Sequence, residues 1–330
     1  MTTPNQHSAI AEAASLLLKG GVVALPTETV YGLAADASNT EAVKRIFAIK
    51  GRPADHPLIL HIADESQLDY WAKSVPEAAR LLARQFWPGP LTLILPRSEK
   101  VSDLITGGQD TVGLRIPDHP LTLSVLHEMG PHAAVAAPSA NRYGRISPTT
   151  AEHVREELGN NVDLILDGGA CNVGLESTIV SFAGDDVCIL RPGGIPVSAI
   201  ENALQRKVSM VDGSSAKVRV SGSTLSHYSP STPLELLPQE QLWQRAGELK
   251  TAGKRFATME WSKPDEAHSG MPEKDRISMP ANAAVYGHLL YATLRTLDQG
   301  GYDYLLAEAP PQTQEWLAVA DRLKRASHKD

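Results

Sequence analysis

The sequence predicts an α/β protein with two domains: a mixed sheet with flanking helices, followed by a smaller α/β domain. Short apolar strands alternate with amphipathic helices up to about residue 205, as in α/β folds. Some of these strands follow one another without an intervening helix, which implies antiparallel pairs and a mixed sheet. From 206 to 233 the apolar periodicity gives way to Ser, Gly, Pro and Thr, a composition typical of a linker. We therefore expect domains at 1–205 and 234–330.

The first domain is expected to begin with a helix over Ser8–Lys19, because Ser8 can cap it and two glycines end it. A buried strand follows at Val22–Leu25, and a helix capped by Asn39 or Thr40 runs to Ala48. Further strands are expected at 58–62, 91–95, 111–116, 134–137, 164–166, 178–182 and 187–190, and helices near 76–85, 120–129 and 149–158. The last two strands should pair antiparallel.

The second domain is expected to contain a strand at Phe256–Glu260, a helix at Ala281–Leu297 and a strand at Tyr304–Ala307. A terminal helix follows and ends in the basic stretch 322–325. The order of these elements predicts a small α/β domain.

Composition excludes several classes of protein. The chain of 330 residues is 42% hydrophobic and 21% charged, with a formal net charge of −7, so no global attraction to nucleic acid or to an anionic membrane is expected. The two cysteines, Cys171 and Cys188, lack metal-ligand spacing and predict neither a disulfide framework nor a zinc site. Without a signal peptide pattern or an apolar run of about 18 residues, we expect a cytoplasmic protein that does not enter the membrane.

Common catalytic signatures are missing: the sequence has no GxxxxGK[ST], no GxGxxG after a strand, no HExxH and no GxSxG. The candidates that remain lie in loops at strand ends, where sites in α/β sheets tend to form. Lys50 and Arg52 follow a helix two residues apart, so in extended backbone both side chains could share a polyphosphate. For Lys50 the alternative is equally good, since a basic residue at a helix C-terminus complements the macrodipole.

Other polar residues occupy similar positions. Ser139, Asn141 and Ser147 follow a short strand and could donate to phosphate or ribose oxygens. The structural alternative in this region is a helix cap, since Thr149 with Glu152 matches a capping box. Arg115 lies in an apolar strand and needs an anionic partner, either a ligand carboxylate or a structural acid such as Asp118.

Tyr31, His61 and Arg191 also lie at strand ends or in the loops beside them. Each alone is more often structural than functional. Because all three occur where strands meet loops, the probability that they form a single site is higher than for any one of them alone.

Six ordered motifs now identify a resemblance: PTETVYGL (26–33), KGRP…HPL (50–58), GLRIP (113–117), APSAN (137–141), ESTIV (176–180) and LRPG (190–193). In this order the chain resembles the threonylcarbamoyl-AMP synthase family, also called YrdC-like. His227-Tyr228-Ser229-Pro230 and the C-terminal sequence resemble its longer, two-domain branch. The resemblance implies a YrdC-like twisted mixed sheet at 1–205, a linker at 206–233, and a Rossmann-like α/β domain at 234–330.

The resemblance also implies a nucleotidyltransferase. Members of this family condense L-threonine, bicarbonate and ATP, with Mg²⁺ carried by the nucleotide, into threonylcarbamoyl-adenylate and pyrophosphate. A downstream tRNA threonylcarbamoyl-transferase complex uses this product to make threonylcarbamoyladenosine next to the anticodon. The resemblance is also compatible with a weak contact between this protein and tRNA.

The resemblance assigns roles residue by residue. The threonine-binding residues would be Thr29, Tyr31, His61, Arg115, Ala137 and Ser177. The ATP-binding residues would be Lys50, Arg52, His56, Thr111, Ser139, Asn141, Ser147, Arg191 and Tyr228, where His56 occupies a position that often carries asparagine. Lys50 and Arg52 would be catalytic, through positioning and charge neutralisation.

Two rival functions differ in what they leave unexplained. An RNA-binding module would use the basic cluster around Lys44 and Arg142, but it gives Tyr31, Arg115 and Ser177 no role. Carbamoyl transfer to another acceptor occurs in larger proteins with a related domain, and this chain lacks the companion domains found there.

Overall fold

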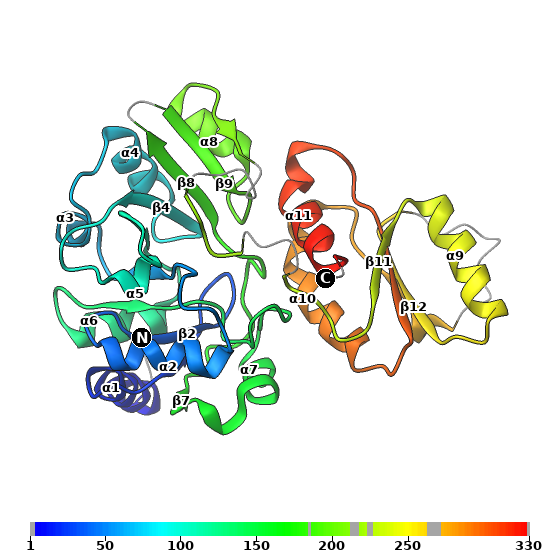
Figure 1. The fold of residues 1–330 in the computed structure, drawn as a ribbon, viewed down its shortest axis with the longest axis horizontal. Helices are drawn as coiled ribbons and strands as arrows, with labels where there is room; N and C mark the ends of the chain where they lie inside the picture. The colour runs from blue at the N-terminus through cyan, green and yellow to red at the C-terminus, as the bar shows by residue number, and fades with distance from the viewer. Residues whose placement is uncertain (1–3, 184–185, 212–217, 223–226, 263–271, 329–330) are drawn as a thin grey trace. The chain divides into compact units, whose positions relative to one another are not determined.

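The computed structural model describes residues 4–183, 186–211, 218–222, 227–262 and 272–328. The chain forms two compact units: Met1–Tyr143 with Ser147–Ser223, and Gly144–Ile146 with Thr224–Asp330 (Figure 1). The predicted linker is divided between them. Both units combine a sheet with helices, which confirms the predicted fold class.

The first unit is built on a mixed sheet. Its described strands lie in the order β10-β9-β8-β4-β5-β3-β6-β2-β1-β7. They are β1 (Val23–Leu25), β2 (Gly32–Asp36), β3 (Ile59–Ile62), β4 (Leu91–Pro96), β5 (Thr111–Arg115), β6 (Ala134–Ala136), β7 (Leu164–Ile165), β8 (Thr178–Ala183), β9 (Asp186–Arg191) and β10 (Ser209–Met210). β3 pairs parallel with β5, and β4 parallel with β8, whereas β4 and β5 are antiparallel. β8 and β9 pair antiparallel, as predicted.

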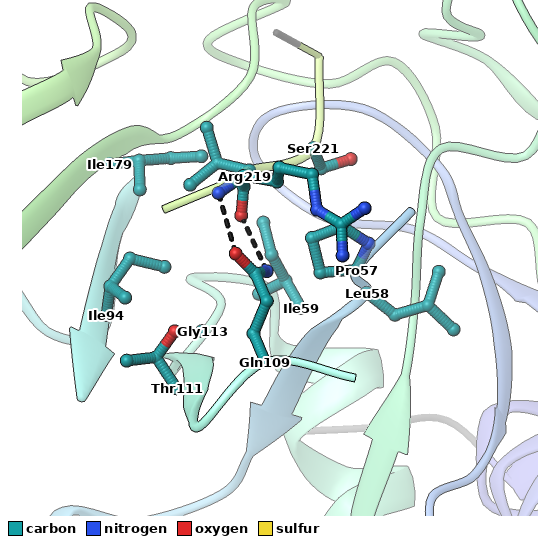
Figure 2. Close-up of a pocket in the computed structure, with 11 residues that line it drawn as sticks. Pro57, Leu58, Ile59, Ile94, Gln109, Thr111, Gly113, Ile179, Arg219 and Ser221 are labelled. Carbon is teal, nitrogen blue, oxygen red and sulfur yellow. Dashed lines mark hydrogen bonds between the residues drawn. The ribbon is translucent and has the colours of Figure 1, made fainter. Parts of the chain in front are cut away.

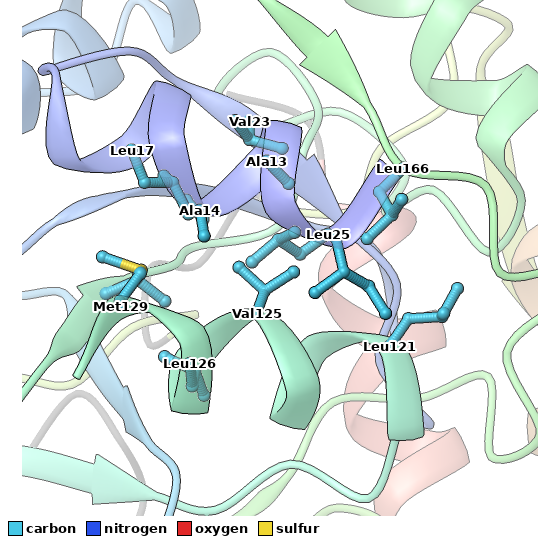
Figure 3. Close-up of a cluster of buried hydrophobic side chains, with 13 residues drawn as sticks. Ala13, Ala14, Leu17, Val23, Leu25, Leu121, Val125, Leu126, Met129 and Leu166 are labelled. Atoms are coloured by element: carbon cyan, nitrogen blue, oxygen red, sulfur yellow. The ribbon is translucent and has the colours of Figure 1, made fainter. Parts of the chain in front are cut away.

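Helices cover this sheet and close its core. They are α1 (Pro4–Leu18), α2 (Thr40–Lys50), α3 (Leu68–Trp71), α4 (Glu77–Phe86), α5 (Asp103–Thr106), α6 (Pro120–Met129), α7 (Ala151–Leu158) and α8 (Val197–Leu204). Figure 3 shows α1 lying against α6, with Leu17, Leu25 and Val125 between them. Each of these side chains is fully buried and stabilises the fold by about 1.5–3 kcal/mol.

The predicted elements of the first unit differ from the observed ones in a few places. β2 was not predicted, because its Gly-Leu-Ala-Ala-Asp sequence has little strand propensity. The short helices α3 and α5 and the longer α8 were also missed. The cap of α7 was assigned wrongly: Thr150, not Thr149, accepts the N–H of His153 at 3.2 Å. Helix α2 ends at Lys50 rather than Ala48, and Asn39 caps it as expected.

The second unit holds a smaller sheet whose strands are all parallel, in the order β11-β14-β12-β13. The strands are β11 (Leu234–Leu237), β12 (Phe256–Glu260), β13 (Arg276–Ser278) and β14 (Tyr304–Glu308), and the helices are α9 (Gln239–Thr251), α10 (Ala283–Asp298) and α11 (Leu317–Ala326). This parallel α/β arrangement confirms the predicted Rossmann-like domain, although β11, α9 and β13 were not predicted. In the described part of the chain, no helix combines the length and apolarity needed to cross a bilayer.

Candidate functional site

Three of the candidate residues, His61, Thr111 and Arg115, lie on one face of the large sheet. Thr111, Gly113 and Arg115 are alternate residues of β5, so these three positions lie on the same face of the sheet. In the parallel pair of β3 with β5, His61 lies opposite Arg115 and Ile59 opposite Gly113. The site therefore extends along a sheet face. The expectation of loops at strand ends was too narrow, because strand residues at period two bring His61, Thr111 and Arg115 into the same surface.

Gly113 lies in the middle of this face and has no side chain that projects from it. A Cβ atom at this position would come within 3.3 Å of the side chains of Ile59, Thr92 and Ile94. Glycine leaves that space to the neighbouring side chains and brings the backbone to the surface. The face between Thr111 and Arg115 is thus shaped by the smallest residue of β5.

Arg115 is held from three sides. Its Nη2 lies 2.6 Å from Oε1 of Glu28, Nη1 donates to Oγ1 of Thr29 at 2.9 Å, and Nε donates to the carbonyl of Gly89 at 3.3 Å. The structural acid is therefore Glu28. Asp118, the acid suggested by the sequence, instead donates its main-chain N–H to Glu28 at 3.0 Å. A guanidinium carries five N–H donors; Nη2 has no hydrogen-bond partner among the described residues, and Nη1 keeps a second N–H, so donors remain for a ligand carboxylate.

His61 lies beside Arg115 and is buried, with 4% of its surface exposed. Burial, and secondly the charge of Arg115, lower the pKa of His61 to about 3. The imidazole is therefore neutral at physiological pH. Among the described residues, its Nδ1 has no hydrogen-bond partner, so this buried nitrogen can serve a ligand.

Lys50 is the last residue of α2, and Gly51 ends the helix in the left-handed conformation with φ 62°. Lys50 and Arg52 therefore do not lie in one extended segment, because the helix continues further than its apolar pattern indicates. The Lys50 Nζ donates to the carbonyls of Ser139 and Asn141, both at 2.5 Å. Burial, and then the charge of Arg52, lower the pKa of Lys50, and the charge of Glu157 partly opposes this shift.

Arg52 and Arg191 meet at one residue, Ser221. Arg52 Nη2 donates to the carbonyl of Pro57 at 2.9 Å and to Oγ of Ser221 at 3.4 Å. Arg191 donates through Nη1 to the carbonyl of Ser221 at 2.7 Å, and through Nη2 to the carbonyl of Ser177 at 2.8 Å. The end of α2 is closed by the main-chain N–H groups of Gly51 and Arg52, so helix capping does not require the Arg52 side chain.

Hydrogen bonds connect these groups into one continuous network. The N–H of Ala140, in the loop bound by Lys50, donates to the carbonyl of Tyr31 at 2.8 Å, and the N–H of Tyr31 donates to the carbonyl of Pro148 at 2.9 Å. Ser147, the residue before Pro148, donates to Glu176 at 2.7 Å. Ser177 follows Glu176 and joins the network to Arg191. The structure thus brings together residues of six separate sequence motifs.

Buried charge in this unit is mostly positive. The buried residues that the structure describes in this unit include four Lys or Arg side chains, Lys50, Arg52, Arg115 and Arg191, and two carboxylates, Glu28 and Glu176. A buried excess of cations is costly without anions nearby. The site is therefore suited to an anionic ligand.

We call residues 218–222 the strap. Figure 2 shows that the side chain of Gln109 pairs with the main chain of Arg219: Oε1 accepts its N–H at 2.7 Å and Nε2 donates to its carbonyl at 3.0 Å. Val220 packs on Ile94 and Ile179, and a cavity of only about 10 Å³ remains beside it. The strap therefore covers the part of the sheet face next to Thr111.

The other predicted residues have the following places. His56 is partly buried, with its Nδ1 3.2 Å from the hydroxyl of Tyr143; burial, and then Arg52, lower its pKa. The N–H of Ala137 donates to the carbonyl of Ile59 at 3.1 Å. Tyr228 is buried in the second unit, where its ring lies 5.6 Å from that of Tyr291.

Sequence reasoning missed Glu28, Glu176 and Gln109 as parts of the site. The first two stand inside recognised motifs, PTETVYGL and ESTIV, so their position was a signal that they could matter. Nothing local in the sequence marks Gln109. Within the described residues, no group of three or more His, Cys, Asp or Glu side chains could hold a metal ion.

Comparison with known proteins covers both units. A family model described as "Telomere recombination" matches residues 15–193, and one described as "Threonylcarbamoyl-AMP synthase, C-terminal domain" matches residues 195–328. The threonylcarbamoyl-AMP synthase of Bacillus subtilis is 41% identical, covering 96% of this chain and 92% of its own length. That of Pyrococcus abyssi is also 41% identical, over 96% and 93% of the two chains.

A crystal structure described as P. abyssi Sua5 complexed with L-threonine has a similar fold. It superposes with a TM-score of 0.87 at 38% identity, covering 96% of this chain and 94% of the other. The likeness therefore extends through both units.

Proposed function

The chain belongs to the threonylcarbamoyl-AMP synthase family, and we propose that it condenses L-threonine, bicarbonate and ATP into threonylcarbamoyl-AMP and pyrophosphate. One observation carries this proposal: buried Lys and Arg side chains outnumber buried carboxylates in the first unit, and one of them is Arg115, which already pairs with the Glu28 carboxylate. Such a surface can bind an amino acid and a nucleotide next to each other. A basic surface that only binds RNA phosphates needs no buried arginine with spare donors.

We assign threonine to the Arg115 end of the face. N–H groups of Nη1 and Nη2 of Arg115 would bind its carboxylate, and Nδ1 of His61 would contact a polar group of the amino acid. Thr29, Tyr31, Ala137 and Ser177 would complete this part. The P. abyssi Sua5 structure complexed with L-threonine supports threonine as a ligand.

We assign ATP to the other end, where cations converge on the strap. Arg52 and Arg191 would bind phosphate oxygens, and the third donor of the Lys50 ammonium would assist them. His56, Thr111, Ser139, Asn141 and Ser147 would contact the rest of the nucleotide. Mg²⁺ would be carried by the nucleotide and would supply neutralisation of the phosphate charge.

The reaction we propose needs little acid-base chemistry from the protein. The threonine amine and bicarbonate give an N-carboxylate and water. An oxygen of this N-carboxylate then bonds to the α-phosphorus of ATP while the bond to the pyrophosphate oxygen breaks. Because the nucleophile is already an anion, Lys50 and Arg52 act by positioning and by stabilising charge in the transition state. A downstream tRNA threonylcarbamoyl-transferase complex would consume the product.

Pyrophosphate release from ATP tests the proposal. We expect release that depends on both L-threonine and bicarbonate, with threonylcarbamoyl-AMP detected by mass spectrometry. Release without threonine, or none at all, would refute it. Carbamoyl transfer to another acceptor predicts a rate independent of threonine, and an RNA-binding module predicts no release.

A further inference from the structure

We propose that Glu28 is a positioning residue, which orients the Arg115 guanidinium for the carboxylate of the amino-acid substrate. The inference rests on the proposed function, because Arg115 is assigned there to threonine. Glu28 does not have to touch the substrate in this role. It acts on Arg115 and on the turn that follows β5.

Glu28 contacts the Arg115 side chain and the Asp118 main chain at the same time, and we call this pair of contacts the clamp. One carboxylate oxygen, Oε1, lies 2.6 Å from Nη2 of Arg115, and the other, Oε2, accepts the main-chain N–H of Asp118 at 3.0 Å. Glu28 therefore fixes both the side chain that ends β5 and the backbone three residues later. Its own carbonyl accepts the N–H of Val173 at 2.7 Å, so the clamp is anchored at its base.

The geometry of the guanidinium explains why this clamp matters for binding. Thr29 accepts one N–H of Nη1 and Gly89 accepts the Nε–H, whereas Glu28 forms an ion pair with Nη2 at 2.6 Å that lacks hydrogen-bond geometry. One N–H remains on Nη1, and Nη2 has no hydrogen-bond partner among the described residues. A carboxylate is best bound by two parallel N–H donors, and this arrangement requires the plane of the fork to be fixed.

Charge gives a second reason. Arg115 and Glu28 have 5% and 4% of their side chains exposed, and the adjacent His61 is neutral. An arginine buried at this depth without an anion is costly, so Glu28 allows Arg115 to remain in place before substrate binds. The same contact could be purely structural. A structural role predicts lower stability with unchanged affinity for threonine.

Three substitutions separate these roles. Glu28→Gln keeps the shape and removes the charge, while Glu28→Asp keeps the charge and shortens the reach by one methylene. Asp163→Asn is the matched control, because Asp163 also pairs with an arginine, Arg45 at 2.9 Å, and also accepts a main-chain N–H, that of Val22 at 2.7 Å. Asp163 lies outside the proposed site. The full chain is assayed for pyrophosphate release with threonine and ATP varied in turn.

We expect Glu28→Gln to raise the KM for threonine about 10-fold to 100-fold, as the loss of a charge-assisted contact implies, with the KM for ATP within about twofold. Glu28→Asp should raise the KM for threonine by at least about threefold at nearly normal thermal stability. If Glu28→Gln does not fold, the aspartate variant alone decides. A normal KM for threonine in every folded Glu28 variant would overturn the proposal.

A double substitution shows whether Glu28 acts through Arg115. Adding Glu28→Gln to Arg115→Gln should raise the KM for threonine no further than Arg115→Gln does alone. Multiplying effects would overturn the proposal, because Glu28 would then act independently of Arg115. The wild-type protein separates the role of Glu28 from the proposed function. If wild type releases pyrophosphate in a threonine-dependent way and the Glu28 variants keep a normal KM for threonine, only the role of Glu28 is rejected. If wild type releases no pyrophosphate, the proposed function is rejected.

Discussion

Replacing Gln109 by Ala should loosen the strap without unfolding the domain. The side chain of Gln109 makes two hydrogen bonds to the main chain of Arg219, at 2.7 and 3.0 Å (Figure 2). Each bond contributes about 0.5–1.5 kcal/mol, so their loss should cost about 1–3 kcal/mol. This corresponds to a rise of about 5-fold to 150-fold in the equilibrium constant for local opening.

The strap should still remain seated in this variant. Val220 is 6% exposed and packs on Ile94, Ile179 and Leu190, a burial worth about 1.5–3 kcal/mol. Ser221 also still accepts hydrogen bonds from Arg191 and Arg52. The variant should therefore open locally more often and keep a nearly normal melting temperature.

Amide hydrogen exchange, followed by mass spectrometry on peptides covering 218–222, measures this opening. We expect faster exchange there by the factor given above, and unchanged exchange at Ala63 and Asp64, whose N–H groups are held in the same way by the side chain of Gln67. Exchange within about twofold of wild type would refute the reasoning. It would mean that packing of Val220, and not the Gln109 bonds, holds the strap.

Arg52→Ala should lower the rate of pyrophosphate release about 10²-fold to 10³-fold, as expected for a group that stabilises transition-state charge; near-normal turnover with a small loss of stability would point to a structural role for its contacts with Pro57 and Ser221 instead. His61 has its pKa depressed to about 3, below the value of about 6.5 in the unfolded chain, so its stabilising effect is complete above pH 6.5 and is lost as the pH falls towards 3. Urea unfolding of wild type and His61→Gln should show the wild type losing about 2 kcal/mol relative to the variant between pH 7 and pH 5, and parallel pH curves would contradict this. Burial raises the pKa of Cys171 to about 12, so iodoacetamide at pH 8 should label it only after denaturation; rapid labelling of the native protein would argue against this environment.

The class of fold followed from local patterns. Helix α2 illustrates this, because an asparagine cap and apolar residues at helical spacing are signals contained within a few consecutive residues. The antiparallel pair of β8 and β9 was likewise predictable, since no helix separates them in the sequence. β2 and β11 escaped prediction because short strands in a large sheet are stabilised by neighbours distant in sequence, and their own propensity is weak.

The candidate residues were recognised by type and order, but their partners were not. From the sequence alone, Arg115 required an anion, and Asp118 and a ligand were equally good choices. Only the folded sheet brings Glu28 to 2.6 Å from it. For Lys50 the sequence left a helix cap and a ligand contact equally good, and only the folded chain shows that its Nζ donates to the carbonyls of Ser139 and Asn141.

By itself, the sequence determined the α/β class, the two-domain order, the family resemblance and the residue types of the site, because propensity, periodicity and motif order are properties of neighbouring residues. The tertiary structure decided which sheet face carries His61 and Arg115, that Glu28 accompanies Arg115, and that Gln109 holds the strap where Ser221 meets Arg52 and Arg191. These contacts join residues far apart along the chain. They depend on strand order and register, which are set by packing of the whole sheet.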